Sequence, residues 1–330
     1  MRPQTINEAK VQVAGKYGLG RLLQGQVAGI SLILIVMVIF LSIFTRTFLT
    51  ATNIFNILRA FSWIAITAFG ECLVIITGGV DLSVGSVMAL SGLIGAMLIA
   101  AGLSVPIGIV GGLATGAAVG VANGVMITKA KLPPFIATLG WLFMGRGLCY
   151  GLTGGWPVRD LPLSFSILGQ YDIPFVGVPI PLIFVLVLAF LVTVFTGQTV
   201  WGYRIYAVGG NEEAAGLSGI NTDRVKIMVY TLASLLAAVG GILMTSRLGV
   251  ASPTAADGYE LDVIAAAVVG GTSFSGGEGT ILGVLIGAAI MQVLRTGLVL
   301  IGTSAYWLQA IQGFVIVVAI MLDQLRKRRR

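Results

Sequence analysis

The sequence contains no histidine and only 10% charged residues, so two common kinds of functional site are missing. Without histidine there is no Ser/His/Asp or Cys/His constellation, and the commonest metal ligand and proton relay are absent. The two cysteines, Cys72 and Cys149, lie in apolar runs that give neither a disulfide framework nor a metal-ligand spacing. We therefore expect a protein that is not an enzyme and that uses no metal and no cofactor.

A nucleotide-binding loop is missing as well. No G-x-x-x-x-G-K-[ST] segment occurs, because Gly15 and Lys16 are followed by Tyr17. The polar stretches 153–178 and 197–226 are each too short for a catalytic domain. If ATP drives this protein, another subunit must hydrolyse it.

Long apolar runs make up most of the chain, which is 57% hydrophobic. A soluble domain would carry about 25% charged residues, whereas each membrane crossing needs roughly 20 apolar residues for ~30 Å of hydrocarbon. We predict an all-α, polytopic transmembrane helical bundle of about ten spans, set in a lipid bilayer. The predicted spans are 27–44, 55–77, 84–101, 106–128, 135–152, 179–197, 227–246, 261–274, 281–300 and 305–323.

The basic residues orient these spans. If the N-terminus starts inside, fourteen lysines and arginines fall on the cytoplasmic side and three fall outside, as the positive-inside rule requires. Both termini are then cytoplasmic and the number of spans is even. The C-terminal RKRRR could bind nucleic acid or anionic lipid, but we interpret it as a positive-inside anchor and expect no nucleic-acid partner. The cytoplasmic group is Arg2, Lys10, Lys16, Arg21, Lys129, Lys131, Arg204, Arg224, Lys226 and RKRRR, and the outer group is Arg46, Arg159 and Arg247.

The predicted domain organisation follows from this topology. A cytoplasmic segment at 1–26 precedes a transmembrane domain at 27–323, and a basic tail follows at 324–330. The transmembrane domain includes a cytoplasmic segment at 198–226. No cleavable signal peptide is evident, and the eighth span is short enough to be broken or re-entrant.

The stretch ECLVIITGGVDLSVGSVMALS at 71–91 places a glycine pair, an aspartate and serines between apolar runs. An ionisable side chain at membrane depth is functional by default, and a glycine-broken helix is tolerated there where it lines a cavity. We assign Glu71, Gly78, Gly79, Asp81 and Ser83 to a translocation path or gate. Asp81 or Ser83 could instead, or also, cap the following helix.

Glu71 itself has two interpretations. It could face a water-filled lumen or pair with Arg59 or Arg146, which would make it a structural residue. It could also contact a solute or form part of a gate. One sequence cannot show which face of the span it occupies.

An internal echo relates ITGGVDLSVG at 76–85 to VVGGTSFSGG at 268–277. Internal repeats mark many transporter folds and place the substrate site at their interface. Small residues are also common in membrane helices, so a chance match stays open, and the two motifs share one orientation, unlike an inverted repeat. On this basis the candidate path includes Gly270, Gly271 and Ser275.

The polar segment GYRIYAVGGNEEAAGLSGINTDRVKI at 202–227 predicts a short exposed helix. Asn211 suits the N-cap, and Glu212 and Glu213 suit the first turn by charge, while Gly219 suits the C-terminal stop. Such a helix cannot bury itself, so we expect it to dock into a groove on a partner or to lie flat on the membrane. We assign the docking surface to Asn211, Glu212, Glu213, Ala214, Ala215 and Gly216.

Three motifs carry a resemblance that covers the chain from about Phe44 to Asp323. TGGVDLSVGSVMALSG (77–92), GGNEEAAGLSGI (209–220) and GYELDVIAAAVVGGTSFSGGEGT (258–280) resemble permease subunits of monosaccharide ABC importers. The nearest likeness is the ribose-type group, which includes xylose, galactose, rhamnose and autoinducer-2 permeases. The motifs are specific for the family and far less specific for the sugar.

The resemblance implies a multi-pass subunit of a bacterial inner (plasma) membrane. Two permease chains would pair around one pathway, two cytosolic ATPase subunits would dock beneath, and a periplasmic binding protein would deliver the sugar. The 211–219 segment matches the coupling region that sits in the ATPase groove. We expect a homodimer and ATP-driven alternating access, with the binding protein docking near 153–178 and 246–260.

Two other classes remain as alternatives. A stand-alone secondary transporter or facilitator would use Glu71 and Asp81 as proton or sodium carriers. A purely structural membrane subunit would need neither. The helix at 209–220 discriminates between these classes, because an ABC permease needs it for coupling and a secondary carrier does not.

Overall fold

The computed structural model describes residues 26–174, 177–304 and isolated positions between 307 and 321. Every regular element in this part is a helix, which confirms the all-α prediction. Seven of the described helices are long and apolar enough to cross a membrane. These are α2 (Gln26–Phe44), α3 (Ala51–Ile76), α5 (Val105–Thr128), α6 (Pro134–Thr153), α8 (Ile180–Gln198), α11 (Thr222–Leu248) and α13 (Ile281–Leu300).

Three predicted spans are not among these seven. Helix α4 (Val84–Ala100) has 17 residues, and α12 (Tyr259–Val269) has 11, so the eighth predicted span is indeed short. The tenth, 305–323, lies largely outside the described residues, as do the segments 1–26 and 324–330. The count of about ten spans therefore stays a prediction.

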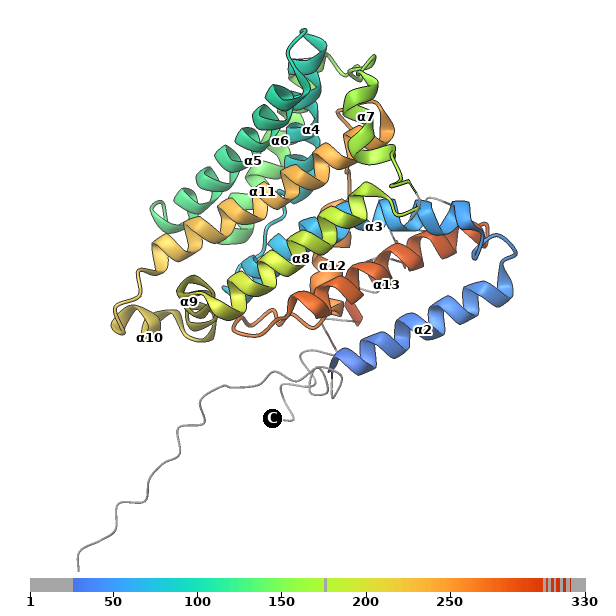
Figure 1. The fold of residues 1–330 in the computed structure, drawn as a ribbon. Helices are drawn as coiled ribbons and strands as arrows, with labels where there is room; N and C mark the ends of the chain where they lie inside the picture. Colours follow the sequence, from blue (N-terminus) through green and yellow to red (C-terminus); the bar gives the residue numbers. More distant parts are fainter. Residues whose placement is uncertain are drawn as a thin grey trace, which may run out of the picture.

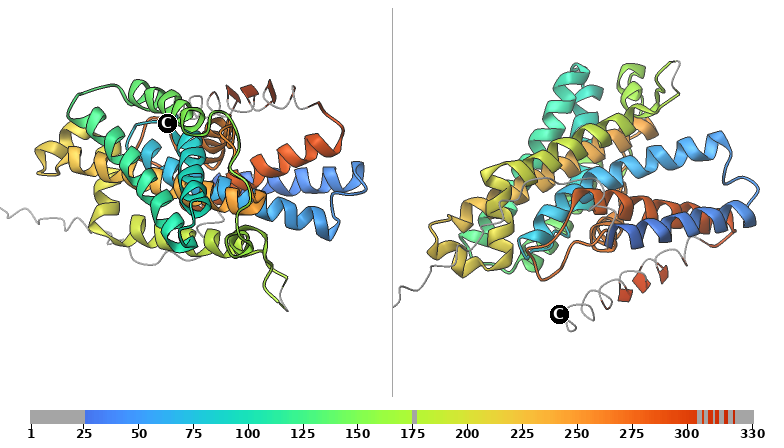
Figure 2. Two further views of the ribbon diagram at one scale, coloured as in Figure 1. Left: turned by 90° about the horizontal axis from the view of Figure 1, so that it is seen from above. Right: turned by 60° about the horizontal axis from the view of Figure 1, so that its bottom comes forward.

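Helices α3 and α11 form the centre of the bundle. Helix α11 packs on α3, α4 and α5, while α3 also packs on α8, α12 and α13 (Figure 1). The most apolar window of α3 is 89% buried, whereas that of α2 at the periphery is 11% buried. Figure 2 shows the same arrangement from two further sides. Any polar side chain on the inner faces of α3 and α11 is consequently far from bulk water.

Helix α5 approaches its neighbours through a stripe of glycines spaced four residues apart. A Cβ on any of them would press against backbone or side-chain atoms of α4 or α11, so small residues set the close helix spacing. The stripe comprises Gly108, Gly112, Gly116, Gly120 and Gly124. It fixes α5 against α11 along most of their shared length.

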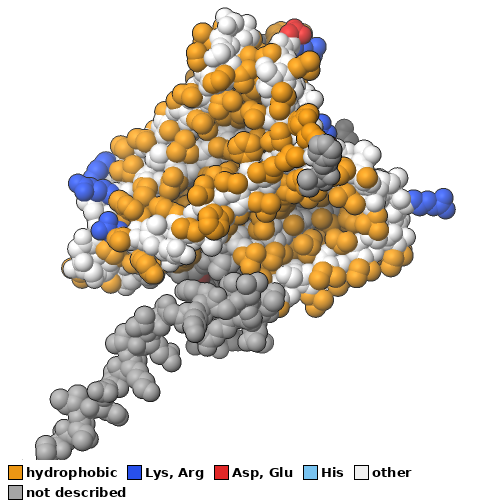
Figure 3. Space-filling view, in the orientation of Figure 1, with side chains coloured by type: hydrophobic (Ala, Val, Ile, Leu, Met, Phe, Trp, Pro, Cys, Tyr) orange, Lys and Arg blue, Asp and Glu red, His pale blue; other side chains and the backbone are white. Residues whose placement is uncertain are grey.

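Short helices mark the two ends of the molecule. Helices α9 (Val200–Gly210) and α10 (Glu212–Leu217) lie at one end, here named the α10 end, and α7 (Leu163–Gln170) lies at the other, the α7 end (Figure 1). Between them hydrophobic side chains cover most of the visible surface, and Lys and Arg gather near the ends (Figure 3). Phe143 and Phe190, each 67% exposed, are typical of this apolar belt.

Candidate gate and coupling segment

The glycine pair ends α3 and turns the chain back. Gly78 has φ +80°, a left-handed conformation that a side chain would strain, and its N–H donates to the Ile75 carbonyl (2.9 Å). The chain then runs without helix to Val84, where α4 begins. The return brings the Asp81 N–H within 3.1 Å of Glu71 Oε1, two turns back from the turn on α3. The two acidic residues singled out from the sequence therefore meet.

A buried hydrogen-bond chain surrounds this contact. Asp81 Oδ1 accepts the Ser83 N–H (2.8 Å) and the Ser83 hydroxyl (2.5 Å), and Ser83 Oγ accepts from Asn123 Nδ2 (3.0 Å). Tyr230 of α11 adds its hydroxyl beside Gly79. Asn123 and Tyr230, missed in the sequence analysis, join Glu71, Asp81 and Ser83 in what we call the gate cluster. Their only signal was a polar side chain in an apolar span.

Several oxygen atoms of the gate cluster have no hydrogen-bond partner in the structure. They are Glu71 Oε2, Asp81 Oδ2, Asn123 Oδ1 and Tyr230 Oη. All four residues are at most 1% exposed. Buried polar atoms are normally paired, so unpaired ones concentrated in one place mark a functional candidate rather than a packing core.

Glu71 does not pair with an arginine, which corrects one of the interpretations from the sequence. Arg59 pairs with Asp172, and Arg146 donates to the carbonyls of Pro253 (2.9 Å) and Ala255 (2.7 Å). Both guanidinium groups are engaged toward the α7 end. The gate cluster therefore holds two carboxyl groups and, among the described residues, no basic side chain bonded to either.

The capping expectation is wrong for Ser83, whereas Asp81 does accept the backbone N–H of Ser83, the residue directly before α4. Ser83 occupies the N-cap position of α4, but its side chain accepts no hydrogen bond from the helix. The Ser83 hydroxyl donates to Asp81 instead, and its oxygen accepts a hydrogen bond from Asn123. Asp81 Oδ1 therefore serves both the start of α4, through the Ser83 N–H, and the gate cluster, through the Ser83 hydroxyl.

Two adjoining cavities lead from the α10 end toward the gate cluster. The outer one has a volume of about 330 Å³, and the inner one reaches Gly78, Gly79 and Tyr230. Ile127, Pro134 and Lys226 line both. Glu71 and Asp81 line neither cavity, so the two carboxyl groups are not reached from the α10 end in this structure.

Helix α10 has the predicted form. Asn211 Oδ1 accepts the Ala214 N–H (2.9 Å), Gly219 follows the helix with φ +85°, and only Ala215 is buried. Leu217 is 86% exposed. The capping geometry is confirmed, and the helix presents an apolar side chain that nothing in the described chain covers.

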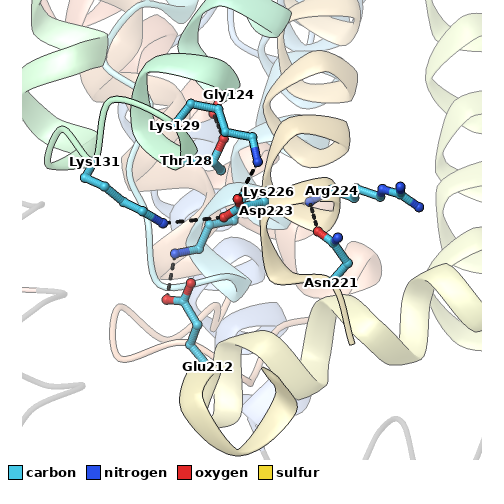
Figure 4. Close-up of polar contacts among 9 residues, drawn as sticks. All are labelled: Gly124, Thr128, Lys129, Lys131, Glu212, Asn221, Asp223, Arg224 and Lys226. Atoms are coloured by element: carbon cyan, nitrogen blue, oxygen red, sulfur yellow. Dashed lines mark hydrogen bonds and ion pairs between the residues drawn. The ribbon is translucent and has the colours of Figure 1, made fainter. Parts of the chain in front are cut away.

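Ion pairs attach α10 and the α5–α6 connection to the first turns of α11 (Figure 4). Lys226 lies 2.6 Å from Glu212, and Asp223 lies 2.7 Å from Lys129 and 3.7 Å from Lys131. Such exposed pairs are worth about 0–1 kcal/mol each. These ion pairs position α10 and the α5–α6 connection relative to α11. Lys226 also lines the inner cavity, one helical turn before Tyr230.

The last residue of α3, Ile76, contacts both α9 and the loop that follows α12. The Ile76 carbonyl accepts the Gly277 N–H (2.9 Å), and Gly209 of α9 packs directly on the same oxygen. The loop that carries Gly270, Gly271 and Ser275 therefore adjoins α3 through Gly277, but these three residues are not part of the gate cluster. Gly270 packs on α13 and Ser275 is exposed.

The echo between the two glycine segments is not reproduced residue by residue. Gly78 has a positive φ while its match Gly270 is helical, and Gly277 has a positive φ while its match Gly85 lies in the first turn of α4. Both segments nevertheless follow the end of a buried helix. Whether they descend from a repeat stays an open prediction.

Comparison with known proteins identifies the family. Residues 53–320 match the model described as branched-chain amino acid transport system / permease component. The chain is 45% identical to the ribose import permease protein RbsC of Bacillus subtilis, over 88% of this chain and 90% of that protein. It is 42% identical to RbsC of Escherichia coli K12 (88% and 91%) and 35% identical to the D-allose transport system permease protein AlsC of the same strain (88% and 89%).

No solved structure matches the fold at a significant level. The family match spans most of the chain. It includes every residue of the gate cluster, the α10 segment and the 270–280 loop. The chain therefore belongs to this family of transport-system permease components.

Proposed function

We propose that the chain is the membrane-spanning permease subunit of a bacterial ABC importer for a ribose-like monosaccharide. Relatives named as ribose import permeases, matched over nearly their whole length, support this substrate class. ATP would be hydrolysed by separate subunits. The observation that carries the proposal is the exposed, capped helix α10, which contacts the elements around the gate cluster and has no use in a protein that works alone.

The proposed topology has about ten spans with both termini in the cytoplasm, and the domain limits given above. The α10 end is then cytoplasmic and the α7 end periplasmic. Lys129, Lys131 and Lys226 at the α10 end support this orientation, since basic residues favour the cytoplasmic side. The protein is a multi-pass protein of the inner membrane.

The proposed partners occupy the two ends. Two ATPases would dock on α10 of two identical permease chains, and a periplasmic sugar-binding protein would dock at the α7 end. Pairing of Val158 with Ala251 (2.9 and 3.0 Å) supports the latter site, because it joins the two segments predicted to receive that protein. Arg146 stiffens the same region by holding two carbonyls of the 251–258 loop.

The proposed mechanism is alternating access with Glu71, Gly78, Gly79, Asp81 and Ser83 in the gate. Movement of α10 reaches the gate along two contacts, through Gly209 to Ile76 and through Lys226 to the turn that carries Tyr230. Unpaired oxygens in the closed gate would bond the solute's hydroxyl groups when it opens, and release requires that binding be weak in one state. Gly270, Gly271 and Ser275 would support the gate through the loop that adjoins Ile76.

Two exposed leucines provide a matched test of docking. Leu217 on α10 is 86% exposed and Leu163 on α7 is 84% exposed. We expect Leu217→Asp to abolish recovery of a P-loop ATPase when the tagged chain is purified from its host in mild detergent, while Leu163→Asp retains it. If no ATPase co-purifies with the unaltered chain, even after cross-linking, the proposal is wrong.

A stand-alone secondary transporter is the alternative, and the gate cluster is the observation that favours it. Two buried carboxyl groups without a basic partner could carry a proton or sodium ion. Proteoliposomes that contain this chain alone distinguish the two functions. Sugar uptake driven by a proton or sodium gradient would support the alternative, and no uptake without ATPase subunits supports the importer.

A further inference from the structure

Three arginines of the described membrane-spanning helices form ion pairs, and the side chain of Arg295 is the most exposed of the three. It lies in α13, a mostly apolar span, and its side chain is 33% exposed, compared with 11% for Arg59 and 17% for Arg146. A guanidinium group in contact with hydrocarbon is strongly disfavoured, so its exposed part must face water or another protein.

Two residues of α12 hold this guanidinium in place. Arg295 Nη1 lies 2.9 Å from Asp262 Oδ2, and Arg295 Cζ lies 4.6 Å from the centre of the Tyr259 ring. The Asp262 side chain is only 3% exposed. These contacts hold the guanidinium against α12, whereas an arginine that snorkels would extend toward the lipid headgroups. Its exposure is therefore a property of the site and not of a free side chain.

The surroundings of the Arg295 guanidinium are polar. Gln292 and Thr296, on neighbouring turns of α13, bond each other at 3.0 Å, and Asp262 Oδ1 is buried without a partner. An arginine fork stacked on a tyrosine ring offers several N–H donors beside a flat apolar face. Because Asp262 already neutralises the guanidinium charge, the site favours a neutral molecule with many hydroxyl groups over an anion.

We propose that Arg295 lines the water-filled path of the transporter and contacts a neutral, polyhydroxylated solute, with Asp262 and Tyr259 as its positioning residues. This inference rests on the proposed importer function. It places a solute contact on α13, outside the gate cluster.

Cysteine accessibility tests the inference directly. Cys72 and Cys149 are both fully buried, so the background reaction with a membrane-impermeant methanethiosulfonate is low. In the complex reconstituted in proteoliposomes, we expect Arg295→Cys to react roughly tenfold faster than Phe190→Cys, because a thiolate forms in water and not in lipid. We also expect the rate to change about threefold between the nucleotide-free and vanadate-trapped states, since alternating access opens and closes the path.

Thr296→Cys provides a second probe that leaves the Arg295–Asp262 pair intact, in case Arg295→Cys fails to assemble. No reaction at either position would place this face against lipid or a partner chain and overturn the inference. An equal rate in both nucleotide states would place Arg295 at a fixed membrane interface and overturn it as well. ATP-dependent sugar uptake by the unaltered complex is measured in parallel, so failure of the importer function is recognised separately.

Discussion

Gly209 at the end of α9 packs on the carbonyl oxygen of Ile76 so closely that a Cβ at Gly209 would overlap it. Ile76 is the last residue of α3, and the gate segment begins directly after it. The helix pair α9–α10 and the gate therefore touch through backbone atoms. A backbone contact cannot adjust by rotating a side chain, so we expect displacement of α9 toward α3 to move the end of α3.

Gly209→Ala tests this contact. The added methyl group forces α9 away from α3, and we expect sugar uptake by the reconstituted complex to fall about tenfold or more, as small misplacements can do. ATPase subunits should still bind, since α10 is unchanged. The measurement is uptake and ATP hydrolysis in the same proteoliposomes.

Gly210→Ala is the matched control. A Cβ at Gly210 meets nothing within 4 Å, and alanine is the better helix former by about 1 kcal/mol. Its uptake should equal that of the unaltered chain. If both variants transport normally, the Gly209 contact does not transmit movement.

Asp81 is expected to be required for transport and not for assembly. Asp81→Ala removes the acceptor of both Ser83 hydrogen bonds, so uptake should fall about tenfold, while the ATPase still co-purifies. Asp81→Asn keeps an acceptor at Oδ1 and removes one of two adjacent buried carboxyl groups, so its Tm should equal or exceed that of Asp81→Ala. Undiminished uptake by Asp81→Ala would make this residue dispensable.

Glu213→Lys should disrupt docking while the chain still inserts into the membrane. Glu212 forms the ion pair with Lys226, whereas Glu213 is exposed on α10, where its charge would favour an ATPase groove that carries basic residues. We expect loss of ATPase from the purified complex with an unchanged amount of the chain in membranes. Normal uptake with normal ATP turnover would contradict the assignment of α10.

Asn211→Ala should loosen α10 alone. Loss of the N-cap costs about 1 kcal/mol, so amides of 214–217 should exchange with deuterium roughly fivefold faster in the isolated chain. The Tm of the whole protein should stay within error, because α10 contributes only Ala215 to the core. Equal exchange rates would show that the cap does not hold this helix.

The α10 segment and most helices could be predicted from the sequence because their causes are local. Asn211, the two glutamates and Gly219 act through atoms a few residues away, and the predicted coupling helix forms between them. Apolar runs likewise predicted the seven long helices to within a few residues. Propensity, capping and hydropathy do not depend on the rest of the fold.

The partners of Glu71 could not be predicted in this way. The sequence offered Arg59 and Arg146, but these pair far from Glu71, and the contacts come from Asp81, across a backbone turn. Asn123 and Tyr230 reach the same cluster from α5 and α11 only because a glycine stripe lets these helices approach closely. Such pairings depend on how helices rotate and cross.

The helical class, the apolar character that suits a membrane and the exposed capped helix all follow from the order of residues along the chain, since each property is set by local composition. The tertiary structure alone decided which polar atoms meet. It brought Glu71 to Asp81, set Gly209 on Ile76 and held Arg295 against Asp262. The last two relationships join residues on separate helices and the first joins a helix to the turn that follows it, so all three depend on how the bundle packs.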